Sequence, residues 1–274
     1  LPKTNHGNVL NHRLSTIDAI KDILAEDGLT EVLNYSFQSD SWIQKFGMKS
    51  SVKVMNPISE EQGFMVPSLL PGLMKAYHEN ERHSFGANVP AIRLFEVRPV
   101  FQAPIDQPIE AKSDSDTGVK EHWVVSFLIS GPRYDQAIQS EQSGVDFYDL
   151  KAIVENLFDK LSTKGIRMRA ADAGLLDSTS MDKCSQLYHS GQSIQVAAGK
   201  EPIGFFGRMH PKLEAEMKVR NPIYWGELKV DPVITLTPMK EKSYKAWSSF
   251  PTMERDFALL VDETVPAENL IQSA

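Results

Sequence analysis

The sequence predicts an α+β fold in which a mainly antiparallel sheet is flanked by helices. Its predicted strands come mostly as hairpins, and long helices separate only some of them. A doubly wound parallel sheet would need a regular alternation of strands and helices, which this chain lacks. The composition agrees, because 41% hydrophobic and 24% charged residues in a chain of 274 are ordinary for a soluble globular protein.

The N-terminal segment predicts a helix followed by a strand. Apolar residues recur there at helical spacing, at Leu14, Ile17, Ile20, Ile23 and Leu24. Gly28 follows where a left-handed helix cap belongs, and residues 32–37 are rich in the β-branched and aromatic residues of strands. Because periodicity reports burial but not the partner, the apolar stripe either packs on the chain's own sheet or forms an interface.

The run that begins at Asn56 carries the strongest local signals. A strand predicted at residues 51–55 ends at Asn56 and Pro57, because proline cannot donate to a ladder and extends its predecessor. Pro71 suits the first turn of a helix, where a missing N–H costs little. This helix is predicted to continue to Arg82.

The middle of the chain predicts further strands and one insertion. Residues 92–97 and 100–101 predict one or two strands. Residues 103–121 are rich in Pro, Ser, Asp and Lys and predict an excursion from the fold. An apolar run at residues 122–130, closed by a Gly-Pro pair, predicts a buried strand.

The second half predicts a long helix and a hairpin. The helix is predicted at residues 145–161, where Asp146 and Asp149 can accept hydrogen bonds from the free N–H groups of the first turn. Residues 193–198 and 203–209 flank a turn sequence and predict the hairpin.

The elements after this hairpin are short. A helix is predicted at residues 211–217, preceded by His210 as a turn residue whose ring bonds nearby backbone. Residues 224–230 predict another strand. Prolines at both ends of residues 232–251 then indicate a linker-like stretch.

Charge and cysteine content exclude several classes of protein. The net charge of −7 argues against a general nucleic-acid platform, which would carry Lys and Arg to displace counterions from phosphates. The short basic cluster at residues 164–169 is interpreted as a solvated strand face. A single cysteine, Cys184, excludes an internal disulfide and suits a reducing compartment. No apolar stretch approaches the ~20 residues that a membrane span needs, and no secretory signal is visible.

No metal or nucleophilic site is predicted. The histidines that could supply ligands are His78, His83, His189 and His210, and their spacing matches no compact metal motif. Cys184 has no context that would activate a thiolate, and no glycine loop resembles a phosphate cradle. The sequence therefore predicts neither a metal ion nor a catalytic residue.

Five blocks of sequence, in order along almost the whole chain, resemble the β chains of phenylalanyl-tRNA synthetases of the bacterial type. The blocks are residues 28–37, the run 56–61 with 68–73, Asn80 and Arg82, and residues 94–97, 146–151 and 203–211. Each block alone is weak, but their common order is a strong signal. The positions that match the family and to which we assign structural roles are Asn56, Pro57, Pro71, Gly72, Glu96, Lys151, Gly204, Gly207, His210 and Pro211. Val66 stands where the family usually places arginine, and Arg98 where it usually places glycine.

The resemblance implies a class II aminoacyl-tRNA synthetase-like core at residues 1–238, from the C-terminal portion of the β chain. Residues 239–274 would form a linker and the truncated start of a ferredoxin-like anticodon-binding domain, because residues 248–261 resemble its opening strand. One strand and the start of a helix cannot bury a core of their own. The missing initiator methionine suggests a piece of a longer chain, and the family's editing domain and magnesium-binding segment would lie before Leu1.

The arginines that amino-acid activation requires are not in the expected pattern. A class II site clamps the phosphates of ATP with arginine, whose planar fork binds phosphate at two points. Arg93 and Glu96 have the wrong spacing for the Arg-x-Glu motif and would point to opposite faces of a strand. Arg208 follows Gly204 and Gly207 without the usual glycine pattern. We therefore expect this fragment to be inactive alone.

The resemblance implies a role in assembly. The α chain of the family carries the active site, so this core would bind that chain for charging of tRNA(Phe) in the cytoplasm, with tRNA contacts made through the holoenzyme. ATP and Mg²⁺ are expected for the holoenzyme and no cofactor for this fragment. The interface candidates are Leu14, Ile17, Ile20 and Leu24. Two alternatives remain open, an active class II ligase in its own right and an isolated tRNA-binding module.

Overall fold

The protein divides into two units of very different size. The computed structural model describes residues 7–49, 52–83, 90–102, 119–134, 143–171 and 184–238, together with single positions between 253 and 270. Contacts group the chain into a compact unit, Leu1–Met239, and a second unit, Lys240–Ala274. The positions described between 253 and 262 lie in neither helix nor strand, and the rest of the predicted opening strand lies outside the described residues. Most of the predicted excursion at 103–121 lies outside them as well.

A seven-stranded sheet forms the centre of the compact unit. Its strand order is β1-β4-β5-β9-β8-β7-β6. In that order the strands are Thr30–Glu31, Ile92–Gln102, Lys120–Ser130, Ile223–Lys229, Glu201–Met209, Tyr188–Ala198 and Ile166–Ala170. The pair β1–β4 is parallel and the other neighbours are antiparallel. The predicted α+β class, with a mainly antiparallel sheet flanked by helices, is confirmed.

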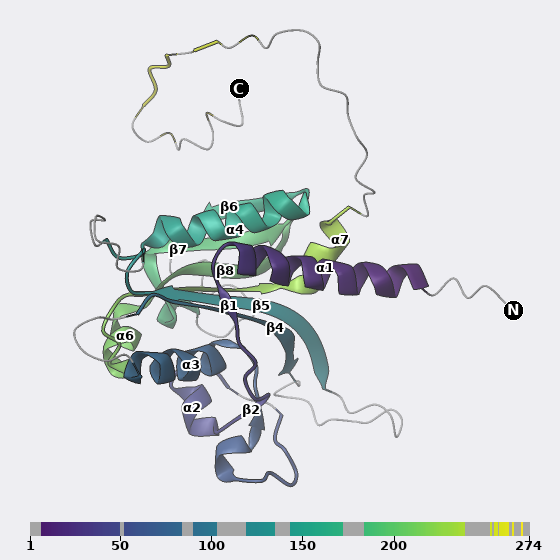
Figure 1. Ribbon diagram of the computed structural model, residues 1–274, viewed down its shortest axis with the longest axis vertical. Helices are drawn as coiled ribbons and strands as arrows, with labels where there is room; N and C mark the ends of the chain where they lie inside the picture. The colour runs from purple at the N-terminus through teal and green to yellow at the C-terminus, as the bar shows by residue number, and fades with distance from the viewer. Residues whose placement is uncertain are drawn as a thin grey trace, which may run out of the picture. The chain divides into compact units, whose positions relative to one another are not determined.

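Two long helices and a short one pack on one face of the sheet. These are α1 (Gly7–Glu26), α4 (Phe147–Leu161) and α7 (Val230–Leu236), with α1 and α4 side by side in Figure 1. Ile17, Ile20 and Leu24 of α1 are 4%, 0% and 0% exposed in the core beneath them, whereas Leu14 is 52% exposed. Three of the four interface candidates therefore pack on the chain's own sheet. Gly28 adopts a φ of +83° after α1, as predicted for a left-handed cap.

The opposite face carries α3 (Leu70–Arg82), α2 (Asp40–Gln44) and α6 (Pro211–Met217), which lie below the sheet in Figure 1. Pro71 occupies the first turn of α3, and α6 begins at Pro211, both as predicted. The ring Nδ1 of His210 caps α6 by accepting a hydrogen bond from the Lys212 N–H at 3.2 Å. Among the helices that the structure describes, none is both long and apolar enough to traverse a bilayer.

The strand predicted at 32–37 is wrong, and so is the one predicted at 51–55 as far as its described residues, 52–55, show. The chain instead forms β1 and a separate two-stranded sheet of β2 (Phe37–Gln38) and β3 (Phe64–Met65), and residues 52–55 contribute a single bridge from Lys53 to Phe64. Short 3-10 turns lie at Glu60–Gln62 and Cys184–Gln186.

Helix α7 was not predicted, because Pro232 suggested a linker. The proline lies in the first turn of α7, where its missing N–H has no helical partner to lose. Val230 and Val233 are 0% and 2% exposed against the core, so this segment is part of the compact unit.

Candidate functional site

A row of polar residues crosses the sheet on the face that α3 partly covers. The strand register aligns Glu96 on β4 with Ser126 on β5, and Ser126 with Glu227 on β9. Residues paired in this way point to the same face of a sheet. The three side chains are 0%, 0% and 3% exposed, so their polar atoms depend on partners within the chain.

The extended segment between β1 and β2 covers Glu96. The backbone N–H and the side-chain amide of Asn34 each donate to the Glu96 carboxylate at 2.8 Å. Arg98 lies 3.2 Å from the same carboxylate and also donates to the Asn34 carbonyl and the Ser36 hydroxyl. A buried carboxylate is tolerated when its charge is paired and its lone pairs are satisfied, and both conditions hold here.

Gly72 of α3 allows this arrangement. A Cβ atom at Gly72 would lie 3.0 Å from the Asn34 Cβ and 3.1 Å from its amide nitrogen, closer than nine in ten real Cβ contacts. Asn34, Gly72 and Glu96, from three separate blocks of the sequence, therefore meet at one place. The sequence did not reveal this convergence, because the contacts span 62 residues between Asn34 and Glu96.

Val66 and Arg98, the two residues that differ from those usual in the family, both contact Ser36 in this region. The Val66 N–H donates to the Ser36 carbonyl at 2.9 Å, and the Arg98 guanidinium donates to the Ser36 hydroxyl. Val66 is 3% exposed, so an arginine at this position would place its guanidinium in the interior near Ser36. In this chain the guanidinium beside Ser36 comes from position 98.

Glu227 is held by the start of α3. Its Oε2 atom accepts hydrogen bonds from the Ser68 hydroxyl at 3.0 Å and from the Leu69 N–H at 2.8 Å. Burial raises the pKa of Glu227 to about 7, opposed by these two donors and reinforced by the charge of Glu96. No cation of the described residues forms an ion pair with it.

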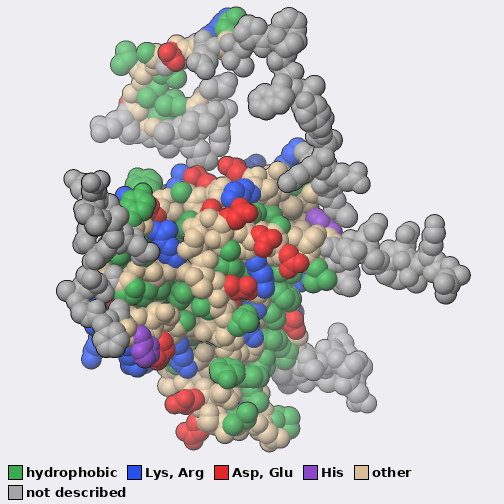
Figure 2. Space-filling view, in the orientation of Figure 1, with side chains coloured by type: hydrophobic (Ala, Val, Ile, Leu, Met, Phe, Trp, Pro, Cys, Tyr) green, Lys and Arg blue, Asp and Glu red, His purple; other side chains and the backbone are tan. Residues whose placement is uncertain are grey.

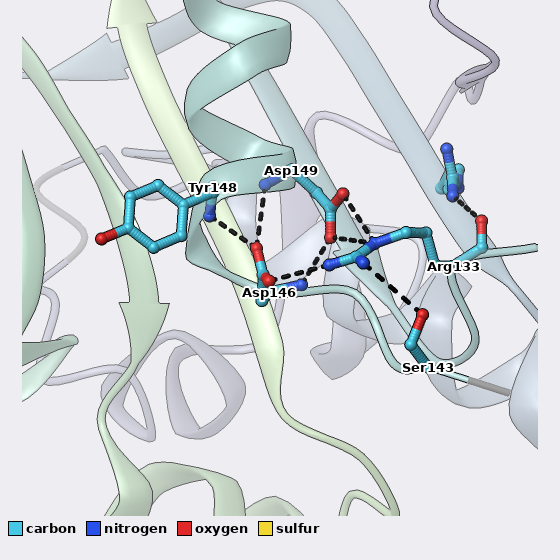
Figure 3. A network of polar contacts seen from close by, with 6 residues as sticks. Arg133, Ser143, Asp146, Tyr148 and Asp149 are labelled. Carbon is cyan, nitrogen blue, oxygen red and sulfur yellow. Dashed lines mark hydrogen bonds and ion pairs between the residues drawn. The ribbon is translucent and has the colours of Figure 1, made fainter. Parts of the chain in front are cut away.

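A second polar network lies at the start of α4 (Figure 3). Asp146 Oδ1 accepts from the N–H groups of Tyr148 and Asp149 at 2.7 and 3.1 Å, and Asp149 accepts from the Asp146 N–H at 2.7 Å. Arg133 lies 2.7 Å from the Asp146 carboxylate and 3.0 Å from that of Asp149. The predicted role of both aspartates in the first turn is confirmed. The sequence did not point to Arg133, whose pKa Asp149 raises.

Each arginine considered for a phosphate clamp is engaged within the chain. Arg93 donates to the Arg133 carbonyl at 2.5 Å, and Arg208 lies 3.0 Å from the Glu214 carboxylate. Arg98 is held by Glu96, as described above. Among the described residues, no group of three or more His, Cys, Asp and Glu side chains could hold a metal ion.

The remaining positions that match the family lie in an ion pair, at close approaches between strands or in a loop. Lys151 lies 2.9 Å from Glu155 one turn later in α4. A Cβ atom at Gly204 would lie 2.0 Å from the Glu227 carbonyl oxygen, and one at Gly207 would lie 2.2 Å from the Gln192 carbonyl oxygen. Both glycines therefore allow neighbouring strands to approach. Asn56 and Pro57 are exposed in the loop before the first 3-10 turn.

Comparisons with known proteins agree with this architecture. Residues 1–230 match the family described as "Phenylalanyl tRNA synthetase beta chain CLM domain". The chain is 27% identical over 270 residues to the phenylalanine–tRNA ligase beta subunit of Syntrophotalea carbinolica, covering 95% of this chain and 30% of that protein. It is 30% identical to the same subunit of Carboxydothermus hydrogenoformans, covering 92% and 29% of the two chains. This chain thus spans less than a third of the length of these relatives.

Solved structures show the same fold at low identity. A pyrrolysyl-tRNA synthetase of Desulfitobacterium hafniense superposes with a TM-score of 0.54 at 13% identity, over 81% of this chain and 67% of that one. A second structure of the enzyme from that organism gives a TM-score of 0.54 at 12% identity, over 81% and 68%. The fold is that of a class II aminoacyl-tRNA synthetase core.

Proposed function

The chain belongs to the family of phenylalanyl-tRNA synthetase β chains, and from this membership we propose that it is a non-catalytic core that supports assembly with the catalytic α subunit. The assembled enzyme would use ATP and Mg²⁺ to charge tRNA(Phe) in the cytoplasm, with tRNA contacts made through the holoenzyme. Activity, partners and cofactors are proposed for the whole enzyme, because this chain spans less than a third of the length of its β-subunit relatives.

The proposal that this core is non-catalytic rests on the hydrogen bonds that its arginines make within the chain. A class II site needs a guanidinium free to bind phosphate at two points. Arg93, Arg98 and Arg208 each donate to an oxygen of this chain. On the same face, Asn34 and the start of α3 occupy the hydrogen-bonding atoms of Glu96 and Glu227. Activation would require breaking contacts that stabilise the fold.

Exposed apolar side chains support the assembly part. In the segment between β1 and β2, Asn34 and Ser36 are held inward by Glu96 and Arg98. The alternating residues Leu33 and Tyr35 are consequently directed outward and are 81% and 73% exposed. In Figure 2 hydrophobic side chains gather on the lower part of the molecule, over the region of β2. Large exposed apolar side chains of this kind indicate a protein interface.

Co-purification with the α chain of the same source tests assembly. We expect a complex whose size-exclusion mass contains both chains. The double variant Leu33→Ser, Tyr35→Ser should weaken it at least about tenfold, since truncating central apolar anchors costs more than 1 kcal/mol each. Met55→Ser with Ile58→Ser is a matched control, because these residues are 94% and 95% exposed on a different loop. A complex that tolerates the first pair but not the second would move the interface to the Met55 loop.

Phenylalanine-dependent exchange of pyrophosphate into ATP tests the non-catalytic part. The chain alone should show no exchange above background, and addition of the α chain should restore it. Robust exchange by the chain alone that Arg93→Ala abolishes would overturn the proposal in favour of an active ligase.

A further inference from the structure

Strand β6 forms one end of the seven-stranded sheet, and within the described residues no strand pairs with its outer side. Gly165 and Ala171, just outside its two ends, each form a backbone hydrogen bond of 2.9 Å with the opposite residue on the β7 side. In an antiparallel pair such bonded positions alternate with unbonded ones. The register therefore directs one set of N–H and carbonyl groups away from β7, those of Ile166, Met168 and Ala170.

The side chains of β6 alternate between two faces of different chemistry. Ile166 and Met168 are half-buried and pack on the core beneath α1 and α4. Arg167 and Arg169 project from the opposite face, and both are exposed, as expected for the basic cluster at residues 164–169. The outer edge of β6 thus presents a partly apolar row on one face and a cationic row on the other.

Neither arginine of this edge is neutralised by a described residue. Arg167 and Arg169 take part in none of the ion pairs that the described arginines form. The Nε atom of Arg169 donates to Gln195 Oε1 at 2.8 Å, and Gln195 is 2% exposed. This bond to a neutral, buried side chain orients the guanidinium and leaves its two Nη groups able to meet a carboxylate at two points.

We propose that the outer edge of β6 binds an extended segment of a partner protein in which acidic and apolar residues alternate. The segment adds a strand to the sheet through the outward backbone groups of β6. Its acidic side chains lie beside Arg167 and Arg169, and its apolar side chains lie beside Ile166 and Met168, because paired strands share their faces.

The same arginines exclude a second copy of this chain as the partner. A second β6 strand that kept apolar side chains together would place its own arginines against Arg167 and Arg169, and like charges across a strand pair are destabilising. Charged side chains guard edge strands against such self-pairing, whereas an acidic strand is attracted to them. Strands β6 and β1 end the sheet on opposite sides, so this edge is separate from the Leu33 and Tyr35 surface proposed for assembly.

Two peptides of the same composition test the alternation. The sequence Glu-Val-Glu-Val-Glu is identical in both directions, so its binding does not depend on strand orientation. The sequence Glu-Glu-Glu-Val-Val has the same charge but cannot separate acidic from apolar side chains by face. Fluorescence anisotropy of both peptides with the same dye, titrated with the full chain, should show the alternating peptide binding at least about tenfold more tightly, because a misplaced carboxylate loses a charged hydrogen bond.

Replacing the arginines tests the cationic row. Arg167→Gln with Arg169→Gln should weaken binding of the alternating peptide at least about tenfold, since two charged contacts are lost. Lys45→Gln with Lys75→Gln is the matched control, because it removes the same charge from α2 and α3 at two lysines that form no ion pair with a described residue. The control should leave the affinity unchanged.

A backbone variant tests strand addition itself. Ala170→Pro removes one outward N–H, and an edge strand tolerates proline where the N–H faces away from the sheet. It should weaken binding about threefold to tenfold, the contribution of one hydrogen bond. Ala170→Ser changes the same exposed side chain but keeps the N–H, so it should bind as the native chain does. The unfolding midpoint verifies that both variants fold, and the arginine variant decides the question if the proline variant does not.

Three results would overturn the proposal. They are equal affinity for the two peptides, binding of the alternating peptide that survives loss of both arginines, and no binding up to about 1 mM of the chain. Binding of a single-stranded oligouridylate through Arg167 and Arg169, without binding of the peptide, would assign the edge to nucleic acid instead. Assembly and pyrophosphate exchange are measured separately, so failure here is distinguishable from failure of the proposed function.

Discussion

Glu96 and Glu227 lie in one cross-strand row but have different kinds of partner. Glu96 has the Arg98 guanidinium 3.2 Å away, whereas the described residues that bond to Glu227 are neutral donors, among them the Ser68 hydroxyl and the Leu69 N–H. Neutral donors offset the loss of hydration less fully than a cation does. This difference explains why burial dominates at Glu227 and raises its pKa to about 7.

The raised pKa of Glu227 makes stability depend on pH. In the unfolded chain this carboxyl titrates near 4.5 and in the folded chain near 7, so the folded state holds the proton more tightly between these values. The contribution of Glu227 to the free energy of unfolding should therefore be greatest below pH 4.5 and should fall as the pH rises to 7. The loss is roughly 3 kcal/mol at most, at 1.36 kcal/mol per pKa unit. Glu227→Gln should remove this slope in urea titrations at pH 5 and pH 8, and an unchanged slope would contradict the assignment.

Val66 and Arg98 should behave as a coupled pair. Arg98→Gly removes the cation beside a buried carboxylate and should cost about 3 kcal/mol. Val66→Arg in the native background adds a charge to a buried position near Ser36 and should also destabilise. In the double variant the guanidinium from position 66 can occupy the space that Arg98 leaves. Urea unfolding should then show at least about 1 kcal/mol of favourable coupling, whereas additive costs would show that the two side chains do not share a site.

Residues with local partners were predictable from sequence. Asp146, Asp149, His210 and Gly28 act on backbone within a few residues, so turn and cap chemistry alone identifies them. The partners of Glu96 and Glu227 were not predictable, because 158 residues separate Leu69 from Glu227 and only the folded register brings them together.

At the scale of the element, the start of α4 depends on its capping box. Asp146→Ala removes the acceptor for two N–H groups and one partner of Arg133, and should lower stability by about 1 to 2 kcal/mol. Asp159→Ala is a matched control in the last turn of the same helix, where a negative charge opposes the helix dipole and its removal should be neutral or slightly stabilising. Thermal unfolding of both variants checks this, and equal losses would show that general charge matters more than the cap.

Two elements show why local pattern fails. The strand expected at residues 32–37 is broken because the Asn34 N–H donates to Glu96 and the Asn34 carbonyl accepts from Arg98, so neither backbone group joins a ladder. The helix α7 was missed because proline was read as a breaker, although its position in the first turn is permitted. In both cases contacts distant in sequence decide between two conformations that the local residues allow.

At the scale of the molecule, one pattern was enough to predict the sheet and its flanking layers: most predicted strands form hairpins, and long helices separate only some of them. The pairing of β7 with β8 follows from a hairpin, which the sequence marks with turn residues. The polar row across β4, β5 and β9 depends on the placement of β9 next to β5, and these strands are far apart in the chain. Fold class was therefore accessible from sequence, whereas the polar row of the candidate site required the structure.

The boundary of the compact unit can be tested by truncation. The matched family region ends at residue 230, but α7 continues to Leu236 and is tied to the unit by bonds from Lys164 N–H to the Leu236 carbonyl and from Arg13 to Asp231. A chain ending at Met239 should keep the unfolding midpoint of the full chain. A chain ending at Lys229 loses the buried Val230 and Val233, at about 1.5 to 3 kcal/mol each, and should unfold several degrees lower. Equal midpoints for the two truncations would show that α7 contributes nothing, and a loss with the longer one would show that residues beyond 239 contribute to the core.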